Sequence, residues 1–498
     1  MTTRFVPSLL RRRTGIVFSV AFSGSVAVGA GCDWTSFDDL ADTASLQSIE
    51  SPEGFTRGTF GSLVYGYRGT PAGSTAAESR LAVSGGLGSP VGVFAAEGAN
   101  GKVNLERPVF FSCEDVDDCG SDQNEDEGAA IGHMQRRMSV MLGELCVVVG
   151  IPGADDDRGQ LNIRCESIPN FSEPVPGPMP GSRFGSAIAP LRPGSPIGGI
   201  VVGAPNADGG RGSALRLPEM GQAIRLGFPT DGDPTTTGAN LGAALAAGTA
   251  ESSDGPVDLV AVGAPGQPGV FLWVSGEEDD GEGGMRPTAI ACDPDLVMGS
   301  SPGFGGVLTM GDFDGDGSDD LAVSYSGTTS MRPDRVHVFL LEPGADGCPS
   351  TATEVELTCP TTAPANGGDG VACAAGTSGF GEALTAGDID GDGDDDLVVG
   401  APSAVVDGNA DAGAIFVYRG EAVVAGGAPD SARRESDPAV GARLGTTLTT
   451  VQIKNRTEIV TGAPGVSETI VVWCSGLPGD NPGDPGVDEG CRGTATAP

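Results

Sequence analysis

The stretch Gly311-Asp-Phe-Asp-Gly-Asp-Gly-Ser-Asp-Asp-Leu-Ala-Val323 decides the fold of this chain. It returns 76 residues later as Gly387-Asp-Ile-Asp-Gly-Asp-Gly-Asp-Asp-Asp-Leu-Val-Val399. Aspartates stand at positions 1, 3, 5 and 9 of each loop: Asp312, Asp314, Asp316 and Asp320, then Asp388, Asp390, Asp392 and Asp396. Because alternate residues of a tight loop turn to the same side, several carboxylate oxygens face one centre. Such a cage suits a hard cation, so the sequence predicts two Ca²⁺ sites.

The residues that follow the acidic loops indicate strands rather than helices. A helix-flanked calcium loop ends with a bidentate glutamate at position 12. Val323 and Val399 stand there instead, within Leu-Ala-Val and Leu-Val-Val runs that are typical of β-strands. The sequence therefore predicts that each calcium loop joins two β-strands.

Each acidic loop lies within a longer repeated unit. The unit opens with Phe-Gly, crosses a strand and the loop, enters a second strand that ends in Gly-Ala-Pro, and continues into a third strand. Seven such units start near residues 60, 131, 184, 241, 304, 380 and 444, and five of them lack the acidic loop. Gly61 and Gly445 are 384 residues apart over six steps, so the mean period is 64 residues.

A period of this length, built from short strands and Gly/Pro turns, indicates a repeat architecture. One unit is too small to bury its own apolar faces, whereas radial stacking of several sheets buries them against one another. The predicted fold is all-β, a seven-bladed β-propeller of four-stranded antiparallel blades. A tandem array of separate β-sandwiches is the alternative, although 64 residues is short for an independent sandwich.

The combination of Phe-Gly, Asp-x-Asp-x-Asp-Gly-x-x-Asp and Gly-Ala-Pro resembles the FG-GAP repeat of integrin α-subunit heads and of many bacterial surface proteins. The resemblance covers residues 55–475. It implies a seven-bladed propeller with calcium on the strand 1–strand 2 turns, opposite the face that integrin heads use for ligand. It also adds the backbone carbonyls of Ser318 and Asp394 to the ligand set. The chain departs from the pattern at Ser84 and Ser324, where Gly-Ala-Pro is lost.

The N-terminal segment has the features of an export signal of lipoprotein type, predicted over residues 1–31. Arg11–Arg13 precede an apolar stretch, Ile16–Val28, and Gly29-Ala-Gly leads to Cys32. Lipidation of Cys32 would anchor the protein in a membrane of a bacterial envelope, at the outer membrane or the cell surface. Residues 32–54 are predicted to be a tether, in which Leu46–Ile49 could complete the last blade, and residues 476–498 form a Pro/Gly-rich tail.

Cysteine usage favours an exported protein. The chain has 11 cysteines, and ten remain if Cys32 carries lipid. Local pairing is plausible for Cys113–Cys119, Cys359–Cys373 and Cys474–Cys491, Cys146 and Cys165 fall opposite each other in one hairpin, and Cys292–Cys348 follows by elimination. Reduced, buried cysteines are the alternative.

A net charge of −39 disfavours nucleic acid and anionic membrane surfaces as partners. The charge fits a solvated exterior, while a cationic partner or saline surroundings stays open. Two acidic runs, Cys113–Glu127 and Gly276–Gly284, are predicted to be weakly ordered surface loops.

The sequence offers few candidate catalytic residues. His133 and His337 fall in different units, His337 alternates with apolar residues on a predicted third strand, and neither a Gly-x-Ser-x-Gly turn nor a P-loop occurs. We therefore expect no enzyme, but a calcium-binding envelope lipoprotein whose propeller binds a protein or glycan ligand or serves adhesion. An envelope hydrolase, a scaffold subunit and a passive structural protein are the alternatives. The Phe-Gly and Gly-Ala-Pro residues are expected to be scaffold.

Overall fold

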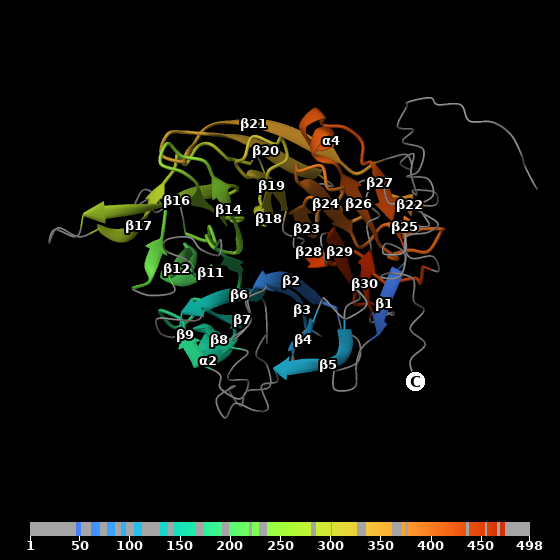
Figure 1. Ribbon diagram of the computed structural model, residues 1–498, viewed down its shortest axis with the longest axis horizontal. Helices are drawn as coiled ribbons and strands as arrows, with labels where there is room; N and C mark the ends of the chain where they lie inside the picture. Colours follow the sequence, from blue (N-terminus) through green and yellow to red (C-terminus); the bar gives the residue numbers. More distant parts are fainter. Residues whose placement is uncertain are drawn as a thin grey trace, which may run out of the picture.

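The computed structural model shows a chain built almost entirely of β-strands (Figure 1). It describes residues 46–50, 61–69, 77–84, 91–95, 104–111, 130–137, 143–165, 173–191, 199–218, 222–228, 237–279, 285–299, 301–325, 335–360, 371–373, 377–434, 438–453, 456–465 and 469–473.

The described strands form seven four-stranded antiparallel sheets. The first three are β2 (Leu63–Gly69), β3 (Glu78–Ser84), β4 (Val91–Ala95) and β5 (Asn104–Phe111); β6 (Ala130–Arg137), β7 (Gly143–Ile151), β8 (Gln160–Cys165) and β9 (Glu173–Pro176); and β10 (Ile188–Pro190), β11 (Ile200–Ala204), β12 (Ser213–Leu217) and β13 (Ile224–Leu226). The next two are β14 (Ala244–Ala250), β15 (Val257–Gly263), β16 (Val270–Asp279) and β17 (Met285–Ala291); and β18 (Phe304–Gly311), β19 (Asp320–Tyr325), β20 (Arg335–Pro343) and β21 (Pro349–Thr358). The last two are β23 (Leu384–Gly387), β24 (Asp396–Ala401), β26 (Ala414–Tyr418) and β27 (Ser431–Arg433); and β28 (Thr447–Ile453), β29 (Arg456–Ala463), β30 (Thr469–Trp473) and β1 (Leu46–Glu50).

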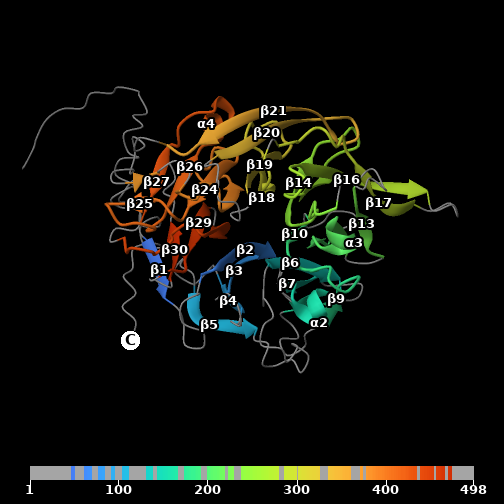
Figure 2. The same cartoon turned by 180° about the vertical axis from the view of Figure 1, so that it is seen from behind.

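The sheets stand around a centre like the blades of a propeller. Their first strands contact one another in the circular order β2, β6, β10, β14, β18, β23, β28 and β2 again, and both faces of the ring show this arrangement (Figures 1 and 2). The predicted all-β propeller of four-stranded antiparallel blades is confirmed. Separate β-sandwiches are excluded for the described residues, because each sheet packs against its two neighbours in the ring. Below, each blade is named by its first strand.

The second strand of each blade explains why the sequence repeats its apolar runs. Every residue of β11, β19 and β24 is buried. A strand covered by a neighbouring sheet on both faces has no solvent side, so its apolar residues stand at consecutive positions instead of alternating. The Leu-Val-Val pattern is therefore the signature of packing between blades.

The glycines of Phe-Gly and Gly-Ala-Pro meet between neighbouring blades. A Cβ added to Gly400 would lie 2.2 Å from the carbonyl oxygen of Gly445, which opens the next blade. The same contact closes the ring, since a Cβ on Gly462 in the last blade would lie 1.9 Å from the oxygen of Gly61 in the first. Only glycine allows this approach of two backbones, which accounts for the recurrence of both motifs.

Both ends of the described chain contribute to the β28 blade. β1 pairs antiparallel with β30, with Leu46 opposite Trp473, so the strand suggested at Leu46–Ile49 lies at the outer edge of this blade (blue beside red in Figure 1). At the opposite, inner edge of this blade, Gly66 N of β2 donates to Thr449 Oγ1 of β28 over 2.8 Å and joins the first blade to the last.

Short elements fill the connections. They are the helical turns α2 (Ala154–Asp157), α3 (Ala207–Gly210) and α4 (Gly420–Ala425), and the strand pair β22 (Val371–Ala372) and β25 (Val405–Val406). No helix among the described residues has the length and apolar character needed to cross a bilayer.

The described residues contain three disulfides: Cys146–Cys165, Cys292–Cys348 and Cys359–Cys373. Cys146 and Cys165 are register partners of β7 and β8, as the hairpin pattern predicted. Cys32, Cys113, Cys119, Cys474 and Cys491 lie outside the described residues. Disulfides persist in oxidising compartments, so the three bonds indicate an extracellular or otherwise oxidising location.

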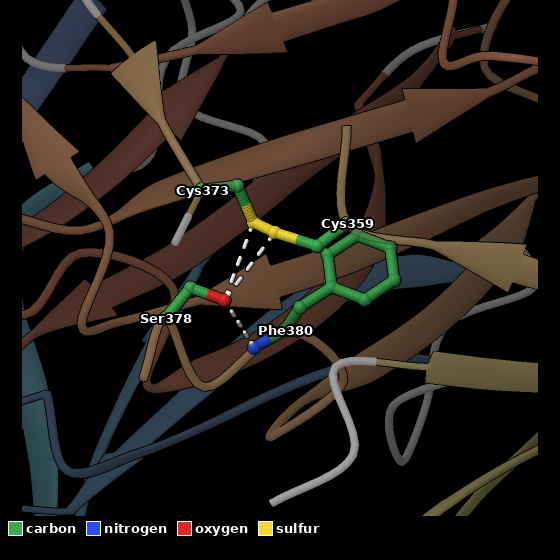
Figure 3. Close-up of a disulfide and its surroundings, with 4 residues drawn as sticks. All are labelled: Cys359, Cys373, Ser378 and Phe380. Carbon is green, nitrogen blue, oxygen red and sulfur yellow. Dashed lines mark hydrogen bonds between the residues drawn. A yellow bond between two sulfur atoms is a disulfide. The ribbon is translucent and has the colours of Figure 1, made fainter. Parts of the chain in front are cut away.

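The Cys359–Cys373 bond lies at the entry to the β23 blade (Figure 3). The Ser378 hydroxyl lies 3.4 Å from Cys359 Sγ and 3.2 Å from Cys373 Sγ, and it accepts a hydrogen bond from Phe380 N over 3.3 Å. The disulfide therefore orders the segment that leads into the Phe-Gly motif of this blade.

The loop predicted for Gly276–Gly284 is wrong in its first four residues, and residues 280–284 lie outside the described residues. Gly276–Asp279 does not form a loop but continues β16, with Gly276 opposite Thr288 and Asp279 opposite Met285 of β17. β16 is the third strand of an antiparallel blade, a position less enclosed than the second strand, so the acidic composition did not prevent pairing. The other run, Cys113–Glu127, lies outside the described residues, as do the export signal and the tail.

Candidate metal centre

The two acidic loops occupy equivalent turns of consecutive blades. The first acidic loop, Asp312–Asp320, joins β18 to β19, and the second, Asp388–Asp396, joins β23 to β24. Each is closed by a strand pair, Gly311 with Asp320 and Gly387 with Asp396. Gly315 has a φ of 72° and Gly391 a φ of 81°, left-handed values that favour glycine and let the chain reverse.

Each loop brings three carboxylates together. Oxygens of Asp312, Asp314 and Asp316 all lie within 4.8 Å of one another, and so do oxygens of Asp388, Asp390 and Asp392. Calcium binds oxygens at about 2.3–2.6 Å, so two ligands on opposite sides of one ion are about 4.6–5.2 Å apart. The spacing and the hard oxygen donors both fit one Ca²⁺ in each triad.

Backbone amides hold the first triad in place. Asp312 accepts from Asp316 N at Oδ1 over 3.1 Å and from Gly317 N at Oδ2 over 3.0 Å. Asp316 Oδ1 accepts from Ser318 N over 2.8 Å. These bonds fold the loop inward and fix the carboxylates relative to one another.

The second triad is held in a similar way. Asp388 Oδ1 accepts from Gly391 N over 2.7 Å, Asp390 Oδ1 from Asp392 N over 3.2 Å, and Asp392 Oδ1 from Asp394 N over 3.1 Å. The two loops thus form comparable cages from the same repeated sequence.

The electrostatics of the loops favour a cation. Burial raises the pKa of Asp314, and the neighbouring carboxylate of Asp316 raises it further. Burial and the neighbouring Asp392 likewise raise the pKa of Asp390, while Arg419 lowers it. A cation between the carboxylates would remove the repulsion that destabilises their charged forms. The donor set is therefore chemically suited to a divalent metal ion.

The position-9 aspartates lie outside the triads. Asp320 is buried, and its carboxylate accepts from Phe313 N over 3.2 Å and from Leu341 N over 2.8 Å. Burial raises its pKa to about 8, against the lowering effect of the Leu341 hydrogen bond. The structure gives this side chain an anchoring role between the loop and β20.

Asp396 occupies the same place in the second loop. Its carboxylate accepts from Ile389 N over 3.0 Å and from Gly420 N, at the start of α4, over 3.2 Å. Burial raises its pKa to about 7. A ligand role for Asp320 and Asp396 stays a prediction beside this structural one.

The two carbonyl ligands suggested by resemblance also stay predictions. The Ser318 side chain is buried, and its Oγ accepts from Glu251 N in the preceding blade over 3.1 Å. Asp394 lies at the corresponding position of the second loop, beside Gly315 of the first.

Sequence reasoning missed Asp319 and Asp395, at position 8 of the loops. Both reach back to the preceding blade: Asp319 Oδ2 accepts from Thr249 N over 2.6 Å, and Asp395 Oδ2 accepts from Asp312 N over 3.2 Å. An aspartate at position 8, directly before the position-9 aspartate in both loops, was the signal for a second role. Only the position-9 residue was predicted to have one.

His337 lies on the third strand of its blade, as predicted. Its Nδ1 is 2.6 Å from Glu354 Oε1 and its Nε2 is 3.3 Å from the Tyr325 hydroxyl. The ring packs edge-on against Phe304, with centroids 5.5 Å apart. His133 lies on β6 in another blade.

One comparison with known proteins supports this architecture. No curated protein matches the chain. The FG-GAP repeat family matches residues 380–418, which include Phe380-Gly381, the second acidic loop and Gly400-Ala401-Pro402. The chain is thus a β-propeller that carries an FG-GAP repeat in the blade of its second acidic loop.

Proposed function

We propose that this protein is a calcium-stabilised binding module of a cell envelope, built on a closed seven-bladed ring. One Ca²⁺ in each acidic loop would hold the strand-joining turns of two consecutive blades. The observation that supports this best is the recurrence of a three-carboxylate cage at the same turn of the β18 and β23 blades. Seven sheets whose first strands contact in a circle support the blade count.

The proposed ligands of the first ion are Asp312, Asp314 and Asp316, together with the Ser318 carbonyl and Asp320. The corresponding set in the second loop is Asp388, Asp390, Asp392, the Asp394 carbonyl and Asp396. A bound ion would neutralise carboxylates that repel one another and would cross-link the loop. Because it binds the folded chain alone, it would add to the free energy of unfolding.

The partner is proposed to be a protein or a glycan, held by the loops on the face opposite the acidic turns. Two calcium ions would offset four charges and leave the chain near −35, which argues against nucleic acid. We also propose that Cys32 is lipidated and anchors the protein to the envelope. The oxidising location indicated by the three disulfides supports export.

We propose binding rather than catalysis. The rival function, an envelope hydrolase, would draw on His337, whose ring nitrogens face Glu354 and Tyr325. That setting also suits a structural role, because the ring packs on Phe304 within the blade. His337→Gln separates the two: loss of a hydrolytic activity at an unchanged melting temperature would favour the hydrolase, and a lowered melting temperature alone would favour the structural role.

The experiment that tests calcium binding is isothermal titration of the metal-free protein. The wild type should bind two ions, and Asp314→Ala and Asp390→Ala should each bind one. Asp254→Ala is the matched control, because Asp254 is exposed in the equivalent turn of the β14 blade and has no triad around it. Two ions in both loop variants would refute the ligand assignment. A pull-down from envelope extracts, with and without a chelator, then tests whether partner capture depends on the metal.

A further inference from the structure

Two hydrogen bonds connect the two acidic loops, one between backbone groups and one to the Asp395 side chain. Asp395 N donates to the carbonyl oxygen of Asp312 over 2.7 Å, and Asp312 N donates to Asp395 Oδ2 over 3.2 Å. Asp312 is the first carboxylate of the first triad, while Asp395 belongs to the second loop. A reciprocal pair of hydrogen bonds therefore joins one candidate metal cage to the other.

Charges of the two loops also lie close together. A Cβ on Gly315 would meet Asp394 Oδ1, so the first loop packs directly against the second. Asp394 of the second loop also lies close enough to Asp314 of the first for their charges to interact. The two loops thus contact each other through hydrogen bonds and through closely spaced charges.

The first loop carries the same connector but reaches a blade without a metal cage. Asp319 N donates to the carbonyl oxygen of Thr249 over 2.7 Å, and Thr249 N donates to Asp319 Oδ2 over 2.6 Å. By the strand registers, Thr249 stands in the β14 blade where Asp312 stands in the β18 blade. The chain therefore contains a natural control. Asp395 contacts a proposed metal ligand, Asp312, whereas Asp319 makes the same contacts with Thr249, which is not one.

Resting on the proposed function, we propose that Asp395 is a positioning residue that couples the two metal sites, so that an ion in one loop strengthens binding in the other. An ion that fixes Asp312 also fixes the Asp312 backbone, to which Asp395 is hydrogen-bonded. The second loop is then partly ordered before its own ion binds. By linkage, the second ion must strengthen binding of the first by the same factor.

The sign of the coupling separates this route from simple electrostatics. Two nearby cations repel each other, and the first ion also reduces the negative field that attracts the second, so the field alone predicts weaker second binding. The hydrogen-bonded connection predicts the opposite. Positive coupling therefore requires a structural link, and Asp395 provides one.

The test compares stepwise calcium affinities by titration calorimetry. Asp390→Ala and Asp314→Ala leave one site each and give the two single-site constants. The coupling factor is the product of the two stepwise association constants of the wild type, divided by the product of the two single-site association constants. We expect a factor of about five or more, the lower end of typical coupling between sites.

Three variants then locate the coupling. Asp395→Ala should bind two ions with a factor near one, Asp319→Ala should keep the wild-type factor, and Asp395→Asn should also keep it, because the amide oxygen still accepts from Asp312 N. The inference is overturned by a wild-type factor at or below one, by equal factors in the two alanine variants, or by loss of coupling in Asp395→Asn. Absence of any calcium binding would instead refute the proposed function itself.

Discussion

Gly400→Ala tests the packing principle that makes this sequence a ring. The added Cβ would lie 2.2 Å from the carbonyl oxygen of Gly445 in the next blade, whereas comfortable contacts of carbon atoms start near 3.5 Å. The blades must therefore separate locally by about 1 Å. Overpacking of a close-packed interior costs about 1–3 kcal/mol, and the upper end applies because backbone lies on both sides of the contact.

The control for this prediction is Gly227→Ala. There the nearest atom to the added Cβ is Arg225 Nε at 3.8 Å, an ordinary contact. Its free energy of unfolding should change by no more than about 0.5 kcal/mol, or rise slightly, since alanine restricts the unfolded chain. Urea denaturation followed by circular dichroism gives both values. If Gly400→Ala is as stable as Gly227→Ala, the contact between blades does not explain the repeated glycines.

Three further predictions concern charge, pH and location. Arg216→Met should cost about 3–5 kcal/mol, because it removes one partner of an ion pair 2.8 Å apart that is buried at an interface between two blades, Arg216 with Asp258. Arg335→Met, which breaks an exposed pair with Glu356, should cost at most about 1 kcal/mol in the same denaturation assay. The melting temperature of the calcium-free protein should fall as the pH rises from about 5 to 8. The reason is the raised pKa of Asp320, about 8, which makes the folded chain bind more protons than the unfolded chain in that window. A melting temperature that does not change with pH, or one that falls equally in Asp320→Asn, would argue against this. Replacing Cys32 should move the protein from the membrane fraction to the soluble fraction, and unchanged sedimentation would reject lipidation.

Much of the fold could be predicted because each blade repeats similar short sequence patterns. Consecutive apolar residues predicted second strands buried on both faces, and β19 and β24 are buried at every residue. The spacing of Cys146 and Cys165 predicted neighbours across one hairpin, which the register confirms. These inferences succeed because they depend on residues a short distance apart in the chain.

The parts that could not be predicted depend on partners in other strands and other blades. The carboxylate of Asp320 resembles a ligand by its loop position, but its strongest anchor, Leu341 N, is 21 residues away on β20. Asp319 and Asp395 act on the preceding blade, and nothing in their own loop identifies that target. Local spacing therefore found the triads but not the connections between them.

Anomalous diffraction from crystals grown with calcium tests the central claim most directly. Two peaks per chain are expected, one among Asp312, Asp314 and Asp316 and the other among Asp388, Asp390 and Asp392, with ion–oxygen distances of about 2.3–2.6 Å. Crystals that diffract well but show no peak in either loop, or show calcium only elsewhere on the surface, would contradict the account.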